Sequence, residues 1–399
     1  MQEKHTSNNY YTGFFKSDHL MDKDKYLFAE SRPDYKFNII GAGMIGQEHI
    51  RVTMLEGRAV IHGIYDINAG SVENTKNMFQ EEFPGRELLT YSTLQEACRD
   101  PEVDGLIICT PNFTHLEVLE EAVKSGKHIM VEKPMATTLE DAARIKKMAE
   151  SYNGVFQIGL QYRYKAIYSE ALHEILERKT IGDVKTISIM EHRVPFLDKV
   201  DQWNKFSEYS GGTLVEKCCH YFDLMNLFAE SKPAKVYAVG DMDVNFRDFE
   251  YEGRRSDIVD DAFVTVVYEN GKKASFNLCM FAPMFYEEIT ICGGQGRLKA
   301  YENEDFLPVE RPSTHLEVLS GESGTAKIGT PCYPAVIQES GHNGATYYEH
   351  KYFIDNIQGR QQSTATADEG FWSIVIGEAA ERSIKTGEVV DVKEMLKEV

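Results

Sequence analysis

The chain of 399 residues lacks a hydrophobic run near the ~20 residues that cross a bilayer, and residues 1–20 lack the apolar segment of a secretion signal. It also lacks a basic tract, and its formal charge is −20. These absences argue against a nucleic-acid partner and against docking on an anionic membrane. The seven cysteines form no C-x-x-C pair, so we expect free thiols in a reducing cytoplasm.

What the chain does have is the composition of a globular protein, with 42% apolar and 27% charged residues. Its length is too great for one ordinary core and suits two domains. In the first half, short apolar runs alternate with amphipathic segments, which predicts a parallel sheet with right-handed helical crossovers. The predicted strands are 36–40, 59–66, 88–91, 103–111, 128–134 and 155–163, and the clearest predicted helices are 71–83, 114–126 and 138–150.

A glycine-rich turn, GAGMIG, lies between the first predicted strand and the helix after it. Gly41 permits the tight turn, Gly43 lets the backbone approach a pyrophosphate, and Gly46 lets helix and strand pack closely. Asp66 ends the next strand, where it can accept hydrogen bonds from the adenosine ribose and would repel a 2′-phosphate. The motif predicts NAD binding and disfavours NADP. Its predicted cofactor contacts are Gly41, Gly43, Met44, Ile45, Gly46 and Asp66.

Two further loops follow predicted strands, at the edge of such a sheet where ligands bind. The first, CTPNFTH, offers Thr110, Pro111, Asn112 and His115 as cofactor contacts, although a turn with a helix cap explains each residue about as well. The second, EKP, offers Glu132, Lys133 and Pro134. A lysine at the end of an apolar strand is costly to bury unless it is used, so Lys133 is the stronger candidate. The alternative is a solvated surface lysine.

From about Lys36 to the C-terminus, the chain resembles the glucose–fructose oxidoreductase / inositol dehydrogenase (Gfo/Idh/MocA) family. The resemblance rests on GAGMIG, YD, CTPNFTH, VEKP and GGTLVEKCCHYFD in that order, and on the C-terminal segments GHNGATYYEHKYFIDNIQG and IVIGEAAERSIKTGEVV. It implies a Rossmann domain followed by an α+β domain with a large, mostly antiparallel open sheet that often mediates oligomers. Members usually oxidise or reduce a sugar, an inositol or a related pyranose with NAD(P).

The resemblance also implies a functional trio: the lysine of E-K-P, an acid, and a histidine four residues after that acid. These are Lys133, Glu216 and His220 here, and the Lys133–Pro134 bond is expected to be cis. The chain departs from the family pattern in having Glu216 where aspartate is usual and Cys218 where glycine is frequent. The domains that follow are an extension over 1–35, an NAD-binding domain over 36–160, and a substrate-binding and oligomerisation domain over 161–399.

The segment GGTLVEKCCHYFDLM, residues 211–225, concentrates acids, cysteines and a histidine. As one helix over 211–229, it would place Glu216, His220 and Asp223 on one face and Cys218 on an apolar face, where it packs in a core. A metal site would need three or four converging ligands, and no matching Cys/His pair occurs elsewhere in the chain. We therefore expect no metal. A buried histidine held by Glu216 is the plainer alternative to a general base.

The general-base interpretation assigns one role to each of the three residues. His220 takes the proton of a hydroxyl group, Glu216 orients the imidazole, and Lys133 stabilises the oxygen as it becomes alkoxide-like. Polar and aromatic residues of the second domain could reach a sugar, although packing explains each of them as well. These substrate candidates are Tyr162, Arg163, His192, Trp203 and His342, with Arg193 beside them.

The leading prediction is an NAD-dependent dehydrogenase of a sugar or cyclic polyol, active as a homodimer or homotetramer. A glycosidase that uses NAD for transient oxidation would need the same Lys, acid and His. A sugar-sensing regulator without turnover is the third alternative, and the presence of all three residues argues against it. The predicted strands of the second domain are 185–194, 235–244, 261–271, 272–281 and 286–294.

Overall fold

The computed structural model describes residues 33–305, 313–321, 324–360 and 365–398. The predicted extension over 1–35 therefore lies outside the described residues, apart from its last three. The chain forms two compact units that interleave along the sequence. Of the described residues, unit 1 comprises 33–132, 151–159 and 334–360, and unit 2 comprises 133–150, 160–305, 313–321, 324–333 and 365–398. Among the described residues, no helix is long and apolar enough to span a membrane.

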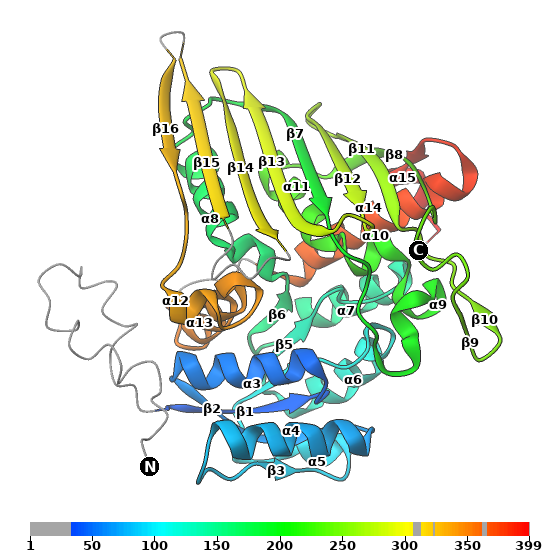
Figure 1. Cartoon of the computed structure of the whole chain (residues 1–399). Helices are drawn as coiled ribbons and strands as arrows, with labels where there is room; N and C mark the ends of the chain where they lie inside the picture. The colour runs from blue at the N-terminus through cyan, green and yellow to red at the C-terminus, as the bar shows by residue number, and fades with distance from the viewer. Residues whose placement is uncertain (1–32, 306–312, 322–323, 361–364, 399) are drawn as a thin grey trace, which may run out of the picture. The chain divides into compact units, whose positions relative to one another are not determined.

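Unit 1 is built on a six-stranded sheet in the order β3-β2-β1-β4-β5-β6 (Figure 1). Every neighbouring pair is parallel, which confirms the predicted α/β class. This order is that of a doubly wound dinucleotide-binding sheet, in which ligands bind at the carboxyl ends of the strands. The strands are β1 (Tyr35–Ile40), β2 (Ala59–Tyr65), β3 (Leu89–Thr90), β4 (Gly105–Ile108), β5 (His128–Glu132) and β6 (Phe156–Gly159).

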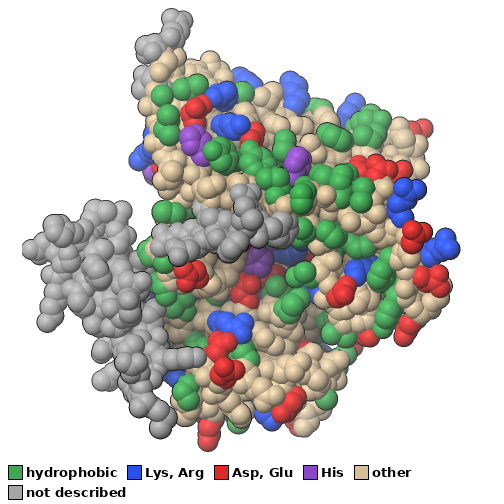
Figure 2. Space-filling view, viewed as in Figure 1, with side chains coloured by type: hydrophobic (Ala, Val, Ile, Leu, Met, Phe, Trp, Pro, Cys, Tyr) green, Lys and Arg blue, Asp and Glu red, His purple; other side chains and the backbone are tan. Residues whose placement is uncertain are grey.

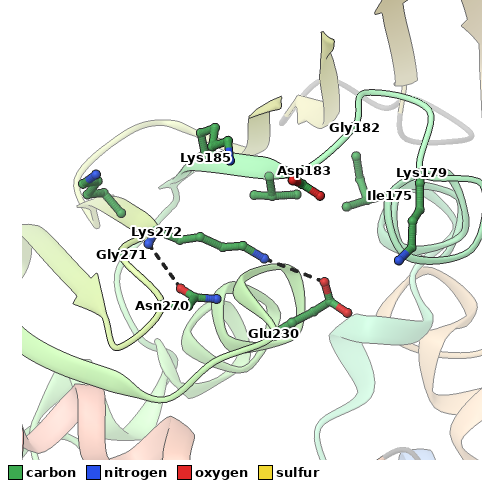
Figure 3. A pocket seen from close by; sticks show the side chains of 11 residues that line it. Ile175, Lys179, Gly182, Asp183, Lys185, Glu230, Asn270, Gly271 and Lys272 are labelled. Atoms are coloured by element: carbon green, nitrogen blue, oxygen red, sulfur yellow. Dashed lines mark hydrogen bonds and ion pairs between the residues drawn. The ribbon is translucent and has the colours of Figure 1, made fainter. Parts of the chain in front are cut away.

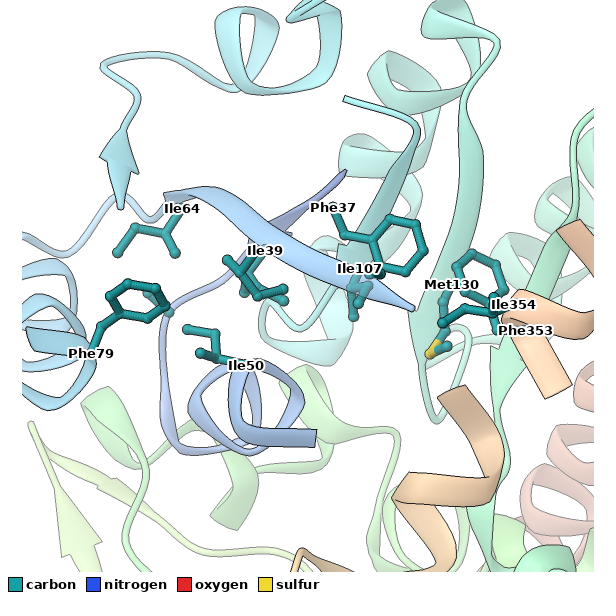
Figure 4. Close-up of a cluster of buried hydrophobic side chains, with 12 residues drawn as sticks. Phe37, Ile39, Ile50, Ile64, Phe79, Ile107, Met130, Phe353 and Ile354 are labelled. Atoms are coloured by element: carbon teal, nitrogen blue, oxygen red, sulfur yellow. The ribbon is translucent and has the colours of Figure 1, made fainter. Parts of the chain in front are cut away.

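The helices of unit 1 follow the predicted alternation with the strands. They are α3 (Met44–Glu56), α4 (Ala69–Glu82), α5 (Leu94–Arg99), α6 (His115–Ala122), α12 (Ala335–Gln338) and α13 (Ala345–Ile357). Strand side chains such as Phe37 and Ile107 are fully buried against helix residues such as Ile50 (Figure 4). Phe353 and Ile354 of α13 belong to the same cluster. The core of unit 1 thus includes a helix from near the end of the chain.

Unit 2 contains a nine-stranded sheet in the order β16-β15-β14-β13-β7-β12-β11-β8-β17. Its pairs are antiparallel except β7 with β12, which confirms the predicted mostly antiparallel sheet. Five strands were predicted, and β14 to β17 are additional. The strands are β7 (Val184–His192), β8 (Pro233–Asp241), β11 (Asp261–Tyr268), β12 (Lys273–Cys279), β13 (Met284–Gly293), β14 (Gly296–Asp305), β15 (Ser313–Ser320), β16 (Thr325–Gly329) and β17 (Val390–Asp391).

One face of this sheet packs against helices, and the other is open. Along β11, buried Ala262, Val264 and Val266 alternate with exposed Phe263 and Val267, as a half-covered strand requires. Figure 2 shows hydrophobic side chains gathered over this sheet. Exposed large side chains on β8 and β11 are Tyr237, Val239, Phe263 and Val267. An apolar surface of this kind is typical of an interaction site.

The remaining elements of unit 2 surround the covered face. They are α7 (Leu139–Glu150), η4 (Gln161–Tyr164), α8 (Ala166–Leu172), η5 (His173–Glu177), η6 (Val200–Lys205), α9 (Ser207–Ser210), α10 (Thr213–Glu216), α11 (Cys219–Ala229), the small pair β9 (Glu250–Tyr251) and β10 (Arg254–Arg255), α14 (Ala367–Thr386) and α15 (Val392–Met395). The two predicted C-terminal helical segments correspond to α13 and α14.

Two local predictions are wrong. The predicted strand over 155–163 ends at Gly159, and residues 161–164 form a 3-10 turn. The predicted helix over 211–229 is interrupted between Glu216 and Cys219. Because the first helix is only one turn long, Glu216 ends it, and His220 is the second residue of a new helix that starts at Cys219. The two side chains are therefore not simply one turn apart on a single helix.

Candidate active site

The glycine turn of unit 1 lies directly between β1 and α3, as predicted. Gly41 has φ +100°, and a Cβ there would lie 2.5 Å from the backbone carbon of Cys109. A Cβ on Gly46 would lie 2.1 Å from the Gly41 carbonyl oxygen. These two positions therefore admit only glycine, because the turn, the helix and the neighbouring loop meet without room for a side chain.

The other two features of this motif leave room for a ligand. A Cβ on Gly43 would meet nothing within 4 Å, and no side chain caps the N-terminus of α3 that follows it. Asp66, immediately after β2, accepts hydrogen bonds from the backbone N–H groups of Ala42 (2.7 Å) and Asn68 (2.7 Å). The carboxylate is thus fixed beside an open helix N-terminus, and this arrangement fits a dinucleotide.

The predicted loop after β4 is held by its own polar groups. Thr114 Oγ1 donates to Thr110 Oγ1 (2.9 Å), and His115 Nε2 lies 3.0 Å from the Thr110 carbonyl oxygen. Asn112 follows Pro111 and is buried, and its Nδ2 donates to no residue that the structure describes. A buried amide without an acceptor is a donor to a ligand if one binds there, so Asn112 is the residue of this loop best suited to hold the cofactor.

Glu132, at the end of β5, belongs to a buried chain of hydrogen bonds that sequence reasoning missed. His49 Nε2 lies 2.8 Å from Glu132 Oε1, and His49 Nδ1 lies 2.7 Å from His350 Nε2. Thr53 Oγ1 donates to the His49 carbonyl, so it accepts from His350 Nδ1. This pattern gives His350 one proton and His49 two. Although burial opposes it, contact with Cys109 and Glu132 raises the pKa of His49 well above its usual range.

This cluster also contains the one group in the described part of the chain that brings three metal-type ligands together. His49, Glu132 and Glu349 place ligand atoms within 4.8 Å of one another, and all three are buried. Both ring nitrogens of His49 already take part in hydrogen bonds. We therefore assign the cluster as a buried imidazolium–carboxylate pair that fixes the end of β5.

Lys133 follows Glu132 in the chain and belongs to unit 2. Its peptide bond to Pro134 is cis, as the resemblance predicted. The Lys133 ammonium donates to the Glu216 carbonyl oxygen (3.0 Å) and lies 3.5 Å from Glu216 Oε1. Burial would raise the pKa of Glu216, but attraction to Lys133, and then to Lys199, Lys217 and Arg193, lowers it. Glu216 is therefore an ionised acid paired with a lysine 83 residues away.

His220 is the second residue of α11 and is buried, as is Glu216. Its imidazole stacks on the Tyr162 ring, with centroids 3.9 Å apart and planes inclined by 8°. Lys217 donates to the Tyr162 hydroxyl (2.6 Å), and its ammonium lies 4.6 Å from the centre of that ring. Cys219 is also buried, and its thiol donates to the Glu216 carbonyl oxygen. Cys218 is fully buried, as predicted.

Lys217 also belongs to a second group of charged side chains. Its ammonium lies 3.2 Å from Glu191 Oε1, and Arg193 Nη1 lies 3.7 Å from the same oxygen. Glu191 is near the end of β7, and burial places it on the covered face of the sheet. Glu191 and Lys217 were not predicted. The signal that could have found them is the alternation of β7, which turns Glu191 inward, and the position of Lys217 next to Glu216.

The predicted substrate residues fall in several places. Tyr162 lies beside His220. Arg163 is buried and pairs with Asp223 and with Glu369, so Asp223 faces an arginine and not His220. His192 projects from β7 on the face opposite to Glu191, where it approaches Tyr286.

Trp203 lies in η6 of unit 2, where it is half-buried. His342 belongs to unit 1, and its Nδ1 lies 2.7 Å from Glu48 Oε1. Burial raises the pKa of Glu48, but His342 and Thr346 outweigh burial and lower it to about 2. Among these candidates, Tyr162 contacts the predicted trio through its stacking on His220.

A pocket at the opposite end of β7 contains no predicted site residue. It is a cavity of about 340 Å³ bordered by the end of α11 and the β11–β12 turn (Figure 3). Lys272 reaches across it to Glu230, at 3.7 Å. The charged side chains that line it are Lys179, Asp183, Lys185, Glu230, Lys272 and Lys273. They are mostly exposed, and we assign the pocket no part in the candidate site.

Comparison with known proteins gives two matches to family models. Residues 35–160 match "Oxidoreductase family, NAD-binding Rossmann fold", and residues 173–392 match "Oxidoreductase family, C-terminal alpha/beta domain" of GFO_IDH_MocA. The chain is 24% identical to myo-inositol 2-dehydrogenase of Thermotoga maritima over 362 residues, which cover 90% of this chain and 99% of that protein.

Two further similarities extend over most of the chain. It is 23% identical to 1,5-anhydro-D-fructose reductase of Ensifer adhaerens over 360 residues, or 90% of this chain and 98% of that protein. A solved structure of levoglucosan dehydrogenase with NADH and L-sorbose superposes with a TM-score of 0.75 at 19% identity. That superposition covers 90% of this chain and 99% of the other. The structural match supports the fold.

Proposed function

The chain belongs to the GFO_IDH_MocA family of NAD-binding oxidoreductases, and from this premise we propose that it oxidises a hydroxyl group of a sugar or cyclic polyol. One observation carries the proposal: the lysine of E-K-P donates to the backbone of Glu216 and pairs with its carboxylate, four residues before His220. Relatives named for myo-inositol and for 1,5-anhydro-D-fructose support the substrate class.

Unit 1 would hold the cofactor through the GAGMIG turn, the N-terminus of α3, Asp66 and Asn112. When bound, a nicotinamide dinucleotide supplies the hydride acceptor. We propose NAD over NADP, because the Asp66 carboxylate beside Ala42 N–H would repel a 2′-phosphate. The same carboxylate can accept hydrogen bonds from ribose hydroxyls, since each of its oxygens has a second lone pair.

The residues of unit 2 would accept the hydroxyl proton and stabilise the oxygen that loses it. His220 is proposed to take the hydroxyl proton, because an imidazole titrates near neutral pH. Lys133 would donate to the same oxygen as negative charge builds on it. Glu216, ionised and paired with Lys133, would keep that ammonium charged and in place. Tyr162 would hold the imidazole plane by stacking.

We further propose a homodimer or homotetramer that uses the open face of the nine-stranded sheet. Exposed apolar side chains support this assignment, because burying them at an interface removes apolar surface from water. They are Tyr237, Val239, Phe263 and Val267. A cytoplasmic location is proposed with it. Light scattering on a sizing column tests the assembly: a monomeric peak for the wild-type chain would contradict it, and Phe263→Asp should shift a wild-type oligomer to monomer.

The decisive experiment is a panel of inositols, pyranoses and their derivatives, incubated with NAD and followed by NADH absorbance and product analysis. A dehydrogenase forms one NADH for each hydroxyl group oxidised. Bond cleavage without net NADH would instead identify a glycosidase that uses transient oxidation. If no member of a broad panel were either oxidised or cleaved while NAD still bound, the catalytic proposal would fail in favour of a sensor.

A further inference from the structure

The charges near Glu216 do not balance. Two carboxylates, Glu216 and Glu191, face three cations: Lys133 lies 3.5 Å from Glu216, and Lys217 and Arg193 lie 3.2 and 3.7 Å from Glu191. Lys199 adds a fourth positive charge that acts on Glu216, and Glu287 adds a third negative charge that acts on Lys217, so that four cations face three carboxylates. This excess occurs in a chain whose formal charge is −20. Local positive charge in an acidic protein indicates a site built for an anion.

The imbalance is costly, because these groups are mostly removed from water. The side chains of Arg193, Glu191 and Lys217 are 13%, 3% and 9% exposed. Buried charges are stable only when they are paired and hydrogen-bonded. Glu191 serves two cations through one oxygen, Oε1, while its Oε2 has no hydrogen-bond partner among the described residues. Glu191 therefore supplies one negative charge to two cations, Lys217 and Arg193.

Arg193 is the least satisfied member of the group. Its Nε donates to the Val194 carbonyl oxygen (2.9 Å), and its Nη1 is too far from Glu191 for a hydrogen bond. A guanidinium has five N–H donors, so the described residues accept only one of them. The rings of Phe196 and Phe285 lie 5.4 and 5.8 Å from Cζ and limit its movement. A rigid, nearly buried guanidinium with unused donors is suited to bind a carboxylate or phosphate with two hydrogen bonds.

We propose that the substrate of the unit 2 site is a sugar or polyol bearing an anionic group, a carboxylate or a phosphate, which Arg193 binds. This inference rests on the proposed function and narrows its substrate class. Arg193 and Lys217 both lie near the Glu191 carboxylate, and Lys217 follows Glu216 in the chain. Binding of the anion and removal of the proton would therefore occur within one cluster of unit 2. Arg193 thus determines specificity and takes no part in proton transfer.

The test uses matched substrates with the purified full chain and NAD. D-glucose is compared with D-glucuronate and with D-glucose 6-phosphate, and myo-inositol with a myo-inositol monophosphate. We expect kcat/KM to be at least about tenfold higher for an acidic member than for its neutral partner, which corresponds to about 1.4 kcal/mol. The uronate and phosphate arms identify which anion is used. A preference for the neutral member in every pair would overturn the inference and leave the dehydrogenase proposal intact.

Arg193→Met should remove the preference. We expect kcat/KM for the acidic substrate to fall at least about tenfold, mostly through KM, while the value for the neutral partner changes less than about twofold. Arg193→Lys, which keeps the charge but loses the planar fork, should fall between. Equal losses for both substrates would contradict the assignment. Arg254→Met is the matched control, because that guanidinium also stacks on two rings, Phe206 and Tyr209, in unit 2.

Binding gives a readout that does not depend on turnover. Glucuronate or glucose 6-phosphate should raise the Tm of wild-type protein, and the shift should be absent in Arg193→Met and retained in Arg254→Met. If Arg193→Met does not fold, Arg193→Lys carries the comparison. If nothing in the panel is oxidised but this Tm pattern holds, the proposed function fails and the anion site stands. No Tm shift with any acidic sugar, together with no acidic preference in turnover, overturns the site.

Discussion

The Tyr162 ring lies flat against the His220 imidazole, 3.9 Å away and inclined by only 8°. The ring is held in turn by Lys217, which donates to its hydroxyl at 2.6 Å. Stacking restricts rotation of the imidazole without using either of its nitrogens. It would therefore orient the imidazole that we propose as the proton acceptor through the face of its ring.

This relationship predicts different results for two changes at Tyr162. Tyr162→Leu removes the stacked ring and should lower kcat by about tenfold or more, with KM for NAD unchanged, because a loosely held base is less often in its reactive geometry. Tyr162→Phe keeps the ring and loses only the bond from Lys217, so its kcat should stay within about threefold of wild type. Steady-state kinetics measures both. Equal losses in the two variants would assign the effect to the hydroxyl group.

Lys133→Met should abolish most turnover and spare cofactor binding. Removal of the ammonium leaves developing charge on the substrate oxygen unstabilised, and we expect kcat to fall by about 10²–10³-fold. His220→Asn should cost a similar factor through loss of the base. NAD affinity, measured by calorimetry, should be unchanged in both. Lys232→Met, which removes a lysine that lies over Trp372, is the control; near-wild-type turnover in Lys133→Met would refute its role.

Asp66→Ala tests the cofactor preference. The change removes the acceptor for ribose hydroxyls and the charge that repels a 2′-phosphate, so Kd for NAD should rise by about tenfold, or ~1.4 kcal/mol, while that for NADP falls. Calorimetry with both dinucleotides measures the two effects. Glu73→Gln, on the exposed side of α4, controls for loss of a negative charge. Unchanged affinity for both dinucleotides would remove Asp66 from the site.

Glu381 should make stability depend on pH. Burial raises the pKa of Glu381 to about 7, although the Leu214 N–H that it accepts (3.0 Å) works the other way. An acid whose folded pKa is raised favours folding when protonated, so its contribution is lost as pH rises from about 4.5 to about 7. At 1.36 kcal/mol per pKa unit, the loss is about 3 kcal/mol.

The measurement is urea unfolding at pH 5 and pH 8. Glu381→Gln keeps an acceptor for Leu214 and cannot ionise, so it should be more stable than wild type at pH 8 and about equally stable at pH 5. The exposed Glu388→Gln should leave the difference between the two pH values as it is in wild type. A Glu381→Gln protein with the same pH dependence as wild type would show that Glu381 is not the titrating group.

Arg163 should act through stability. Its guanidinium donates to Asp223 and Glu369 inside unit 2, so Arg163→Met leaves a buried carboxylate without its partner and should cost about 3–5 kcal/mol of unfolding free energy. Arg163→Met combined with Asp223→Leu should recover much of that loss. Unfolding in urea measures both. A large rise in substrate KM with unchanged stability would instead support the substrate contact predicted from the sequence.

Much of unit 1 could be predicted because its signals are local. Gly41, Gly43 and Gly46 lie within six positions whose backbone needs are specific, and the strands on either side of the motif are mainly apolar. Lys133 and Glu216 were identified separately, each from its own motif. That they pair could not be derived from either motif, since the contact joins residues 83 positions apart through folding of unit 2.

The missed features depend on contacts that no short pattern encodes. Glu191 and Lys217 share a charge cluster only because β7 turns one inward and the break after Glu216 redirects the other. Arg163 looked like a sugar ligand because it follows a Rossmann strand, yet Asp223 and Glu369 engage it. Strand β14 was missed because its polar and charged residues, such as Lys299 and Glu302, weaken the apolar alternation that identifies strands.

The packing of Phe353 and Ile354 against Phe37 and Ile107 has a consequence for biosynthesis. During translation, strands β1 to β6 leave the ribosome long before α13 does. Until α13 is synthesised, one side of the core of the nascent nucleotide-binding domain is therefore exposed to water. A fragment ending at Gly159 would be in the same condition permanently. We therefore expect such a fragment to aggregate when expressed alone and to become soluble when a peptide spanning residues 334–364 is supplied with it.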